Sequence, residues 1–319
     1  MKRKVKRSIN FILMMFLVVA MIVGCSKNEN TGTQSGGTPK EGLKVVATTT
    51  MLADLAQVIG KDRVQVQGLM GAGIDPHLYQ ASAGDVTLMQ EADVIVYNGL
   101  HLEGKMGEIF EQLASQNKNI ISIENGLDHG KLLMAEDEPN VHDPHIWFDV
   151  MIWKDAAKVV ADGLAMADPE GKESYEANLT AYLAELDEVD GYIKKRVEEI
   201  PMESRVLVTA HDAFQYFGKA YGIEVRGLQG VSTEAEAGTA DVSELADFIA
   251  EKKIKAIFVE SSVPTKTIEA LQSAVKAKGF EVSIGGELYS DSLGDPGTDH
   301  GTYIGTMKAN IDTIVDALK

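Results

Sequence analysis

The sequence predicts an α/β protein of two lobes, each with a roughly four-stranded, mostly parallel sheet and flanking helices, joined by one long rigid helix. Two observations predict this class. Short runs rich in Val and Ile alternate with longer segments of helical periodicity, and this βαβ pattern occurs in two successive series. A long helical pattern of its own lies between the two series. The 319 residues are enough for two domains that each bury a core.

The first 24 residues have the features of a secretion signal. Five basic residues among the first seven precede an apolar run over 11–23, which is too short to span a membrane comfortably. Gly24 and Cys25 follow this run directly, and this arrangement resembles the lipobox of bacterial lipoproteins. That resemblance implies a lipoprotein signal peptide over 1–24 and a lipid on Cys25. The alternative is an uncleaved anchor helix that ends in a buried or free thiol.

Composition and charge narrow the classes of function. The chain has 30 basic and 48 acidic residues, and removal of 1–24 leaves 25 basic ones, so the mature net charge is −23. Such a charge disfavours nucleic acid as a partner. Cys25 is the only cysteine, which excludes an internal disulfide and a thiolate zinc cluster, so a metal site must use imidazole and carboxylate ligands. Residues 26–42 offer nothing apolar to bury, so 25–42 is predicted as a flexible tether.

The two lobes are predicted from their β-type runs and lie on either side of the segment 172–200. The N-terminal lobe is expected over 43–171, with strands at Leu43–Thr48, Val64–Leu69, Val94–Asn98 and Ile120–Ile123. The C-terminal lobe is expected over 201–319, with strands at Val206–Thr209, Glu224–Gly227, Ile257–Glu260 and Glu281–Ile284.

The segment 172–200 predicts a single linking helix. Its apolar residues recur at spacings of three and four, and Asp168-Pro169 before it and Pro201 after it are start and stop signals. A helix is a stiffer connection than a pair of extended strands, so large hinge closure between the lobes is not expected. The alternative is two helices with a turn near Asp190-Gly191, because glycine disfavours a helix interior.

The histidines supply the chemistry that this sequence offers. His77 and His145 each end an Asp-Pro-His tripeptide in a predicted loop, and His211 directly follows a predicted strand. Asp291 follows the last strand and offers an oxygen. Because ligands of open α/β sheets bind beyond the carboxyl ends of the strands, these residues are candidates for one shared site. The alternative is that Asp-Pro-His is only a turn, and His142 competes with His145.

At these residues the chain resembles a known family. From Leu43 to Lys319 it is similar to the metal-binding subunits of ABC transporters for manganese, zinc and iron, the TroA-type or cluster A-I solute-binding proteins. The segments that carry the resemblance are Asp75-Pro76-His77, Asp143 to Asp149, Ala210 to Phe214, Gly227 to Ser232, Ile257 to Ser262 and Gly285 to Asp291. The resemblance implies two α/β lobes joined by a rigid helix, with one metal ion in the cleft between them.

The resemblance also implies the ligands. They are His77 and His145 from the first lobe and His211 and Asp291 from the second, so His145 is favoured over His142. Three imidazoles and one carboxylate suit Zn²⁺, Mn²⁺ or Fe²⁺. Ligand imidazoles usually donate their other N–H to an acceptor. The expected supporting residues are the carboxylates Asp149, Asp212 and Glu260 and the aromatic Trp147.

The expected function is capture of one divalent transition metal outside the cytoplasm and its delivery to an ABC transporter permease. The resemblance implies a monomer anchored to the membrane through the lipid on Cys25, and no enzyme activity. Two alternatives stay open, a surface-anchored zinc hydrolase and an adhesin. A hydrolase is disfavoured because four protein ligands close the metal's coordination shell and the sequence has no His-Glu-x-x-His motif.

The chain departs from two family patterns that bear on the identity of the metal. Manganese members often have a glutamate where this chain has His211. Zinc members often have a long His-rich loop where this chain has only the acidic segment 129–142. Such a ligand set ranks Zn²⁺ above Mn²⁺ in intrinsic affinity, whichever metal is transported.

Overall fold

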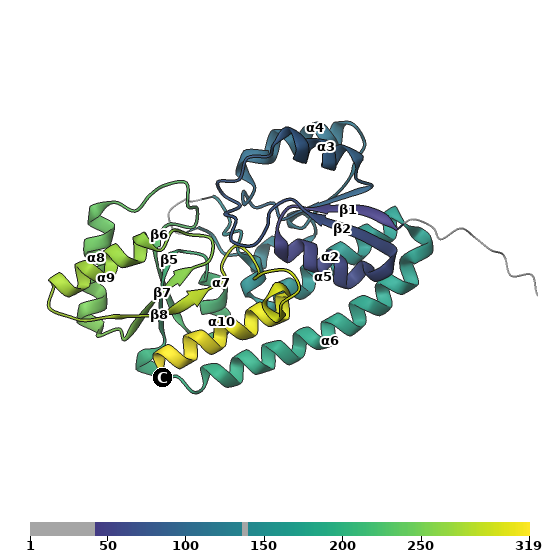
Figure 1. The fold of residues 1–319 in the computed structure, drawn as a ribbon. Helices are drawn as coiled ribbons and strands as arrows, with labels where there is room; N and C mark the ends of the chain where they lie inside the picture. The colour runs from purple at the N-terminus through teal and green to yellow at the C-terminus, as the bar shows by residue number, and fades with distance from the viewer. Residues whose placement is uncertain (1–41, 136–139) are drawn as a thin grey trace, which may run out of the picture. The chain divides into compact units, whose positions relative to one another are not determined.

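A computed structural model describes residues 42–135 and 140–319 (Figure 1). The expected signal peptide over 1–24, Cys25 and nearly all of the expected tether therefore lie outside the described residues. Within the described ranges, no helix is both long enough and apolar enough to cross a membrane.

The first sheet is parallel and four-stranded, in the order β2-β1-β3-β4. Its strands lie where the Val- and Ile-rich runs predicted them, at β1 Leu43–Ala47, β2 Val64–Gly68, β3 Val94–Tyr97 and β4 Asn119–Ser122. Val45 pairs with Val66 on one side and with Val94 on the other, which places β1 in the interior of the sheet. The helices of this part are α2 Thr50–Gly60, α3 Ala83–Glu91, α4 Gly107–Ser115 and α5 Val150–Ala167.

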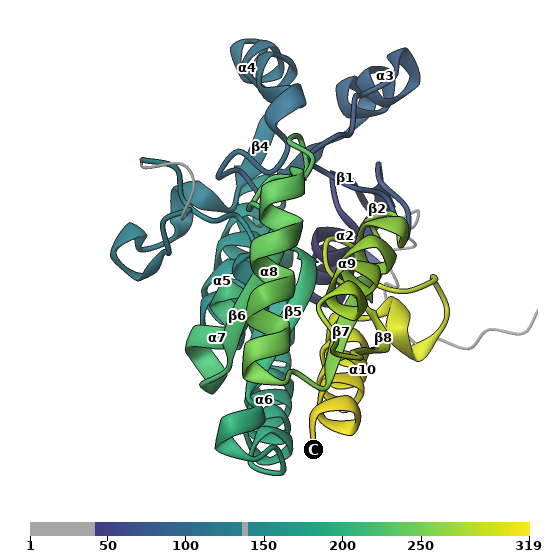
Figure 2. The same cartoon turned by 90° about the vertical axis from the view of Figure 1, so that its left-hand side faces the viewer.

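The later strands form two parallel pairs, β5-β6 and β7-β8, where the sequence predicted one sheet of about four strands. Figure 2 shows the two pairs beside each other, with α8 near one and α9 near the other. Their strands are β5 Val206–His211, β6 Glu224–Gln229, β7 Ala256–Glu260 and β8 Ser283–Leu288. The helices are α7 Gln215–Tyr221, α8 Thr239–Lys252, α9 Lys266–Ala277 and α10 Tyr303–Leu318.

Strand β8 continues four residues beyond its predicted end at Ile284, through Gly285 and Gly286. Pairing with β7 outweighs the low strand preference of glycine here. A Cβ on Gly285 would lie only 2.7 Å from the Phe258 ring, so the close packing of β8 on its neighbours requires a glycine at this position.

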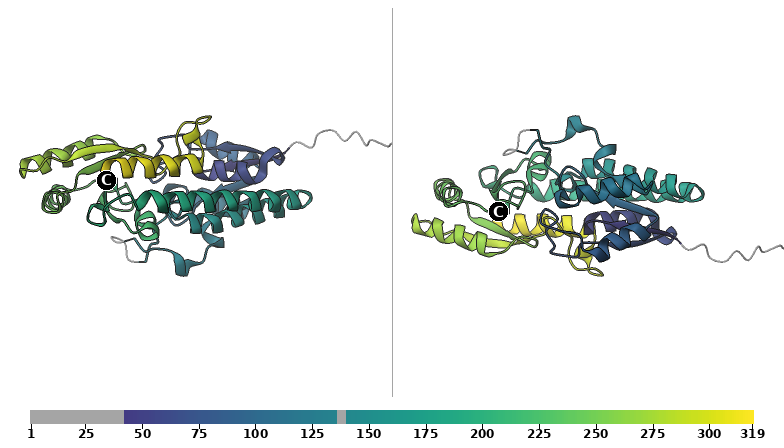
Figure 3. Two further views of the ribbon diagram at one scale, coloured as in Figure 1. Left: turned by 90° about the horizontal axis from the view of Figure 1, so that it is seen from below. Right: turned by 90° about the horizontal axis from the view of Figure 1, so that it is seen from above.

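The segment between the two groups of strands is one helix, α6 Lys172–Val197. The alternative of a turn near Gly191 is therefore wrong. Gly191 lies on the exposed side of α6, and a Cβ added there would meet no atom within 4 Å. The helix buries a stripe that includes Tyr182, Leu186 and Ile193, and it packs against α2 and α5 and also against α10 (Figures 1 and 3).

Hydrogen bonds also join the two groups of strands and helices directly. Asp54 on α2 accepts the backbone N–H of Tyr303 at 2.9 Å, at the start of α10. Thr50 Oγ1 accepts the N–H of Leu293 at 2.8 Å. One cluster of buried side chains includes residues of α2, α5, α6 and α10. The linking helix therefore belongs to a shared core and is no isolated connector.

Candidate metal centre

Four side chains that lie far apart in the sequence meet beyond the carboxyl ends of the strands. His77 lies in the irregular segment between β2 and α3, and His145 lies just before the short helical turn that leads into α5. His211 is the last residue of β5, and Asp291 follows β8. These residues form the one group of three or more potential metal-ligating side chains found among the described residues.

The ligand atoms of this group lie within 4.8 Å of one another. The Nε2 atom of His145 lies 3.3 Å from that of His77 and 3.4 Å from that of His211. Asp291 Oδ2 lies 3.8 and 3.3 Å from the Nε2 atoms of His77 and His211, and Asp291 Oδ1 lies 3.4 Å from that of His145. A tetrahedral ion with ligands at about 2.0–2.1 Å requires edges of about 3.3–3.4 Å. The four side chains fit an ion of this size.

The repeated Asp-Pro-His tripeptide has the same local structure in both places. In each, the aspartate Oδ1 accepts the backbone N–H of the histidine two residues later, Asp75 that of His77 and Asp143 that of His145, both at 2.9 Å. This side-chain turn, with the intervening proline, fixes the chain at the histidine. Asp-Pro-His can therefore form a turn and at the same time supply a potential metal ligand.

A carboxylate orients two of the three imidazoles. His145 Nδ1 lies 2.7 Å from Asp143 Oδ1, and His211 Nδ1 lies 2.6 Å from Glu260 Oε2. Because an ionised carboxylate only accepts, each Nδ1 carries a hydrogen, so Nε2 is the atom left to give its lone pair to a metal once any proton on it is displaced. Glu260 lies where the sequence predicted an orienting acceptor. Asp143 was not identified from the sequence as an orienting residue. Its position two residues before His145, in the repeated Asp-Pro-His tripeptide, was a signal for that role.

Asp149 and Asp212 were also predicted to orient imidazoles, and both have other hydrogen-bond partners. Asp149 is the N-cap of α5, where its Oδ1 accepts the N–H groups of Met151 and Ile152 at 2.8 and 3.4 Å. Its position directly before a helix explains this, because the first N–H groups of a helix need acceptors. Asp212 accepts a hydrogen bond from Gln215 at 2.8 Å.

Trp147 closes one side of the centre. Its ring stands edge-on to the His145 ring, with centroids 5.2 Å apart. Its Nε1–H donates to the backbone oxygen of Ser290 at 3.0 Å, next to Asp291. Phe214 packs on Phe148 at a centroid distance of 4.2 Å. These rings exclude water from the centre on this side.

The segment that carries Asp291 is held by Asn310 of α10, which the sequence did not single out. The Asn310 side chain is buried, accepts the N–H of Tyr289 at 2.9 Å and donates to its carbonyl oxygen at 2.8 Å. Ser290 is fixed in turn by a 2.8 Å hydrogen bond with Ser262. Only the tertiary fold brings Asn310 to this segment, which lies 21 residues away in the sequence.

Burial and neighbouring charges shift the pKa values of the ligand side chains in opposite directions. Burial lowers the pKa of His77 to about 3, so this imidazole is neutral. Burial also disfavours a charged His145, but Asp143 and Asp291 outweigh it and raise the pKa of His145 to about 9. Glu260 and Asp291 likewise raise the pKa of His211 well above its ordinary value. Despite burial, His211 and His145 hold the pKa of Asp291 well below its usual range.

The carboxylate of Asp291 is the group that most needs a positive partner. It is 1% exposed, and both oxygens are buried without a hydrogen-bond partner within the described part of the chain. A buried ionised group is costly unless it is paired or coordinates a metal. A cation among the three Nε2 atoms gives this carboxylate a positive partner, so the arrangement fits a metal ion.

The remaining histidines are not part of the group. His142 Nδ1 lies 3.2 Å from the carbonyl oxygen of Leu133, and its ring packs edge-on against His129. His300 Nδ1 lies 3.1 Å from the Tyr289 hydroxyl, and His101 is exposed.

Comparison with known proteins places the chain in a family. The family described as "Zinc-uptake complex component A periplasmic" (ZnuA) matches residues 45–317. The chain belongs to the ZnuA family. The fold class and the family resemblance predicted from the sequence are thereby confirmed.

Named relatives of the ZnuA family bind different metals. The chain is 49% identical to the zinc-binding protein TroA of Treponema pallidum over 86% of this chain and 88% of that one. It is 44% identical to the manganese-binding lipoprotein MntA of Bacillus subtilis over 95% and 99%. It is 33% identical to the iron ABC transporter substrate-binding lipoprotein MtsA of Streptococcus pyogenes over 98% and 99%.

A solved structure supports the fold directly. The periplasmic zinc-binding protein TroA from Treponema pallidum superposes with a TM-score of 0.84 at 48% identity, covering 87% of this chain and 99% of that one. Of the relatives named here, MtsA is named as a substrate-binding lipoprotein of an ABC transporter, and none carries the name of a hydrolase or an adhesin. These relatives therefore give no support to the hydrolase and adhesin alternatives.

Proposed function

We propose that His77, His145, His211 and Asp291 bind one divalent transition-metal ion as transport cargo. The observation that supports this most strongly is the buried Asp291 carboxylate, whose oxygens have no hydrogen-bond partner within the described ranges and face three imidazole Nε2 atoms. Three nitrogens and one carboxylate suit Zn²⁺, Mn²⁺ and Fe²⁺, the metals named for the relatives.

The coordination favours capture over catalysis. A catalytic zinc ion usually keeps one coordination position for water, whereas four protein ligands fill a tetrahedral shell. The proposed ligands are also almost fully buried, His77 being 3% exposed and His145 and His211 0%. Such a centre binds an ion and shields it from water, as a carrier requires, and leaves no position for a substrate.

The proposal continues beyond the centre to the membrane. The lipid on Cys25 holds the protein at the extracytoplasmic face, and the loaded monomer delivers its ion to the permease of an ABC transporter. The Gly24-Cys25 sequence and the names of two lipoprotein relatives support this part. Replacing Cys25 with Ala should move the protein from the membrane fraction to the soluble one. A Cys25→Ala protein that stays with the membrane would contradict the lipid anchor.

Native mass spectrometry of the protein lacking residues 1–24 tests the metal proposal. After anaerobic loading with Zn²⁺ and removal of excess metal, the expected mass is that of one ion per chain. The His77→Ala variant should retain none, because the three remaining ligands leave the ion open to water. The control is His142→Ala, which removes a histidine outside the group and should retain one ion. Equal retention by both variants would overturn the assignment.

A further inference from the structure

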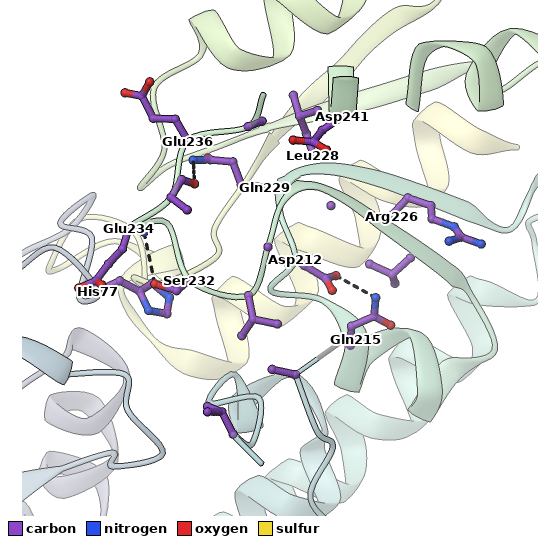
Figure 4. Close-up of a pocket in the computed structure, with 18 of the residues that line it drawn as sticks. His77, Asp212, Gln215, Arg226, Leu228, Gln229, Ser232, Glu234, Glu236 and Asp241 are labelled. Carbon is purple, nitrogen blue, oxygen red and sulfur yellow. Dashed lines mark hydrogen bonds between the residues drawn. The ribbon is translucent and has the colours of Figure 1, made fainter. Parts of the chain in front are cut away.

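His77 differs from the other three proposed ligands in its surroundings. A cavity of about 1280 Å³ has His77 in its wall, whereas His145, His211 and Asp291 do not line it. Figure 4 shows His77 at one edge of this cavity, in the same part of the view as Ser232 and Glu234. The metal centre therefore faces the cavity through His77, and an ion that enters or leaves by this route must pass that side chain.

The segment that carries His77 is held from the opposite lobe. Thr233, in the loop between β6 and α8, donates its hydroxyl hydrogen to Asp75 Oδ2 at 2.6 Å. The other oxygen of Asp75 accepts the backbone N–H of His77. The Asp75 carboxylate thus joins the loop of Thr233 to the backbone of a proposed ligand, across 158 residues of sequence.

Burial makes this contact stronger than its neighbours. Thr233 is 7% exposed and its partner is the half-buried carboxylate of Asp75, so the hydrogen bond is charge-assisted and partly shielded from water. The nearby contact between Lys105 and Glu234 also joins the lobes, but its atoms are 3.7 Å apart and both side chains are well exposed. An exposed ion pair of this kind contributes little.

The far end of the same segment is anchored separately. The Gly73 N–H donates to Ser292 Oγ at 2.8 Å, next to Asp291. Loss of the Thr233 bond would leave the segment attached to the opposite lobe at Gly73 and would release Asp75 from that lobe, while Asp75 Oδ1 could still accept the His77 N–H. The two contacts divide the segment into an anchored end and a releasable end.

We propose that the Thr233–Asp75 hydrogen bond is a latch that sets the rate at which the metal leaves through the cavity. Thr233 acts as a positioning residue, since it reaches the ion only through Asp75 and His77. This inference rests on the proposed function. It assigns the control of release to one contact between the lobes and requires no large movement of the lobes about α6.

Stopped-flow release of Zn²⁺ into excess chelator tests the latch on the protein lacking residues 1–24. Thr233→Val keeps the shape of the side chain and removes the donor, so release should become about tenfold faster or more. Thr233→Ser keeps the hydroxyl and should release at the wild-type rate. The matched control is Thr180→Val, which removes an exposed hydroxyl bonded within α6 and should change nothing.

A double-variant cycle separates the latch from a general loosening of the loop. In an Asp75→Ala background, Thr233→Val should add no further acceleration, because its partner is already gone. An undiminished acceleration in that background, or wild-type release by Thr233→Val, would overturn the latch. Thr233→Ala repeats the test if the valine variant does not fold. Failure of the wild-type protein to retain any ion would instead contradict the proposed function.

Discussion

Glu260 holds His211 at two points: its Oε2 lies 2.6 Å from the imidazole Nδ1, and its Oε1 accepts the backbone N–H of the same residue at 2.9 Å. Both side chains are buried. Glu260, at the end of β7, thus fixes the ring orientation and the tautomer of His211, at the end of β5.

Replacing Glu260 with Gln should weaken zinc binding by about 10–100-fold, because a neutral amide no longer fixes the tautomer and polarises the imidazole less. Competition against a chelator of known affinity measures this loss. Glu251→Gln, on the exposed side of α8, removes the same charge away from the centre and should bind as the wild type does. An unchanged affinity of the Glu260 variant would show that His211 needs no orienting carboxylate.

Equimolar Zn²⁺ should displace Mn²⁺ from the loaded protein. Imidazole nitrogen favours Zn²⁺ over Mn²⁺, and the proposed set has three such ligands. Metal analysis after anaerobic dialysis against both ions measures the outcome. Manganese that persists against equimolar zinc would indicate a coordination richer in oxygen than three imidazoles and one carboxylate.

Asp54 should make stability depend on pH. Burial outweighs its hydrogen bond from Tyr303 and raises the pKa of Asp54 to about 6. A raised pKa in the folded state means that the stabilising effect of protonation is complete below pH 3.8 and is lost as the pH rises through about 6. Asp54→Asn, which can still accept the Tyr303 N–H, should therefore raise the free energy of unfolding at pH 7.5 by about 1–2 kcal/mol, after allowance for partial solvent screening.

The check on this prediction is urea denaturation of the metal-free protein at two pH values. At pH 4 the wild-type and Asp54→Asn proteins should have nearly equal stability, because Asp54 is then protonated. A gain that is the same at both pH values would show that the effect does not come from the charge.

Gly191→Ala should stabilise the protein. Gly191 lies within α6 and an added Cβ meets nothing, so alanine removes the helix penalty of glycine at no steric cost. The expected gain is about 0.5–1 kcal/mol in the free energy of unfolding, with unchanged metal binding. Gly163→Ala is the contrasting variant, since its Cβ would lie 2.4 Å from Ile121, and it should destabilise. A Gly191→Ala protein that is less stable than the wild type would indicate a bend at this residue.

The strands and the proposed ligands could be predicted from sequence because each carries a local signal. Val- and Ile-rich runs marked the strands. His77 and His145 each end an Asp-Pro-His tripeptide, His211 and Asp291 follow predicted strands, and the family resemblance selected these four candidates as the ligands. Strand β8 was placed too early, because its pairing with β7 depends on contacts that the local sequence does not reveal.

The supporting residues were harder to predict, because their roles are set by tertiary contacts. Asn310 contacts Tyr289, and Thr233 contacts Asp75, only when the chain has folded. Asp149 was assigned to an imidazole, although an aspartate directly before a helical pattern is a capping signal. The contact of Asp143 with the His145 ring depends on the conformation of the turn, because Asp75 in the other tripeptide bonds the His77 backbone and Thr233 instead.

Zinc K-edge X-ray absorption of the Zn²⁺-loaded protein lacking residues 1–24 tests the proposed centre most directly, because scattering from imidazole rings can be counted. The prediction is three imidazoles and one carboxylate oxygen, at about 2.0–2.1 Å, with no sulfur. The His211→Ala variant, like His77→Ala, should retain no zinc after excess metal is removed and should lose this spectrum. A wild-type spectrum with fewer than three imidazoles, or one unchanged by that substitution, would contradict the assignment of His77, His145, His211 and Asp291 as the metal ligands.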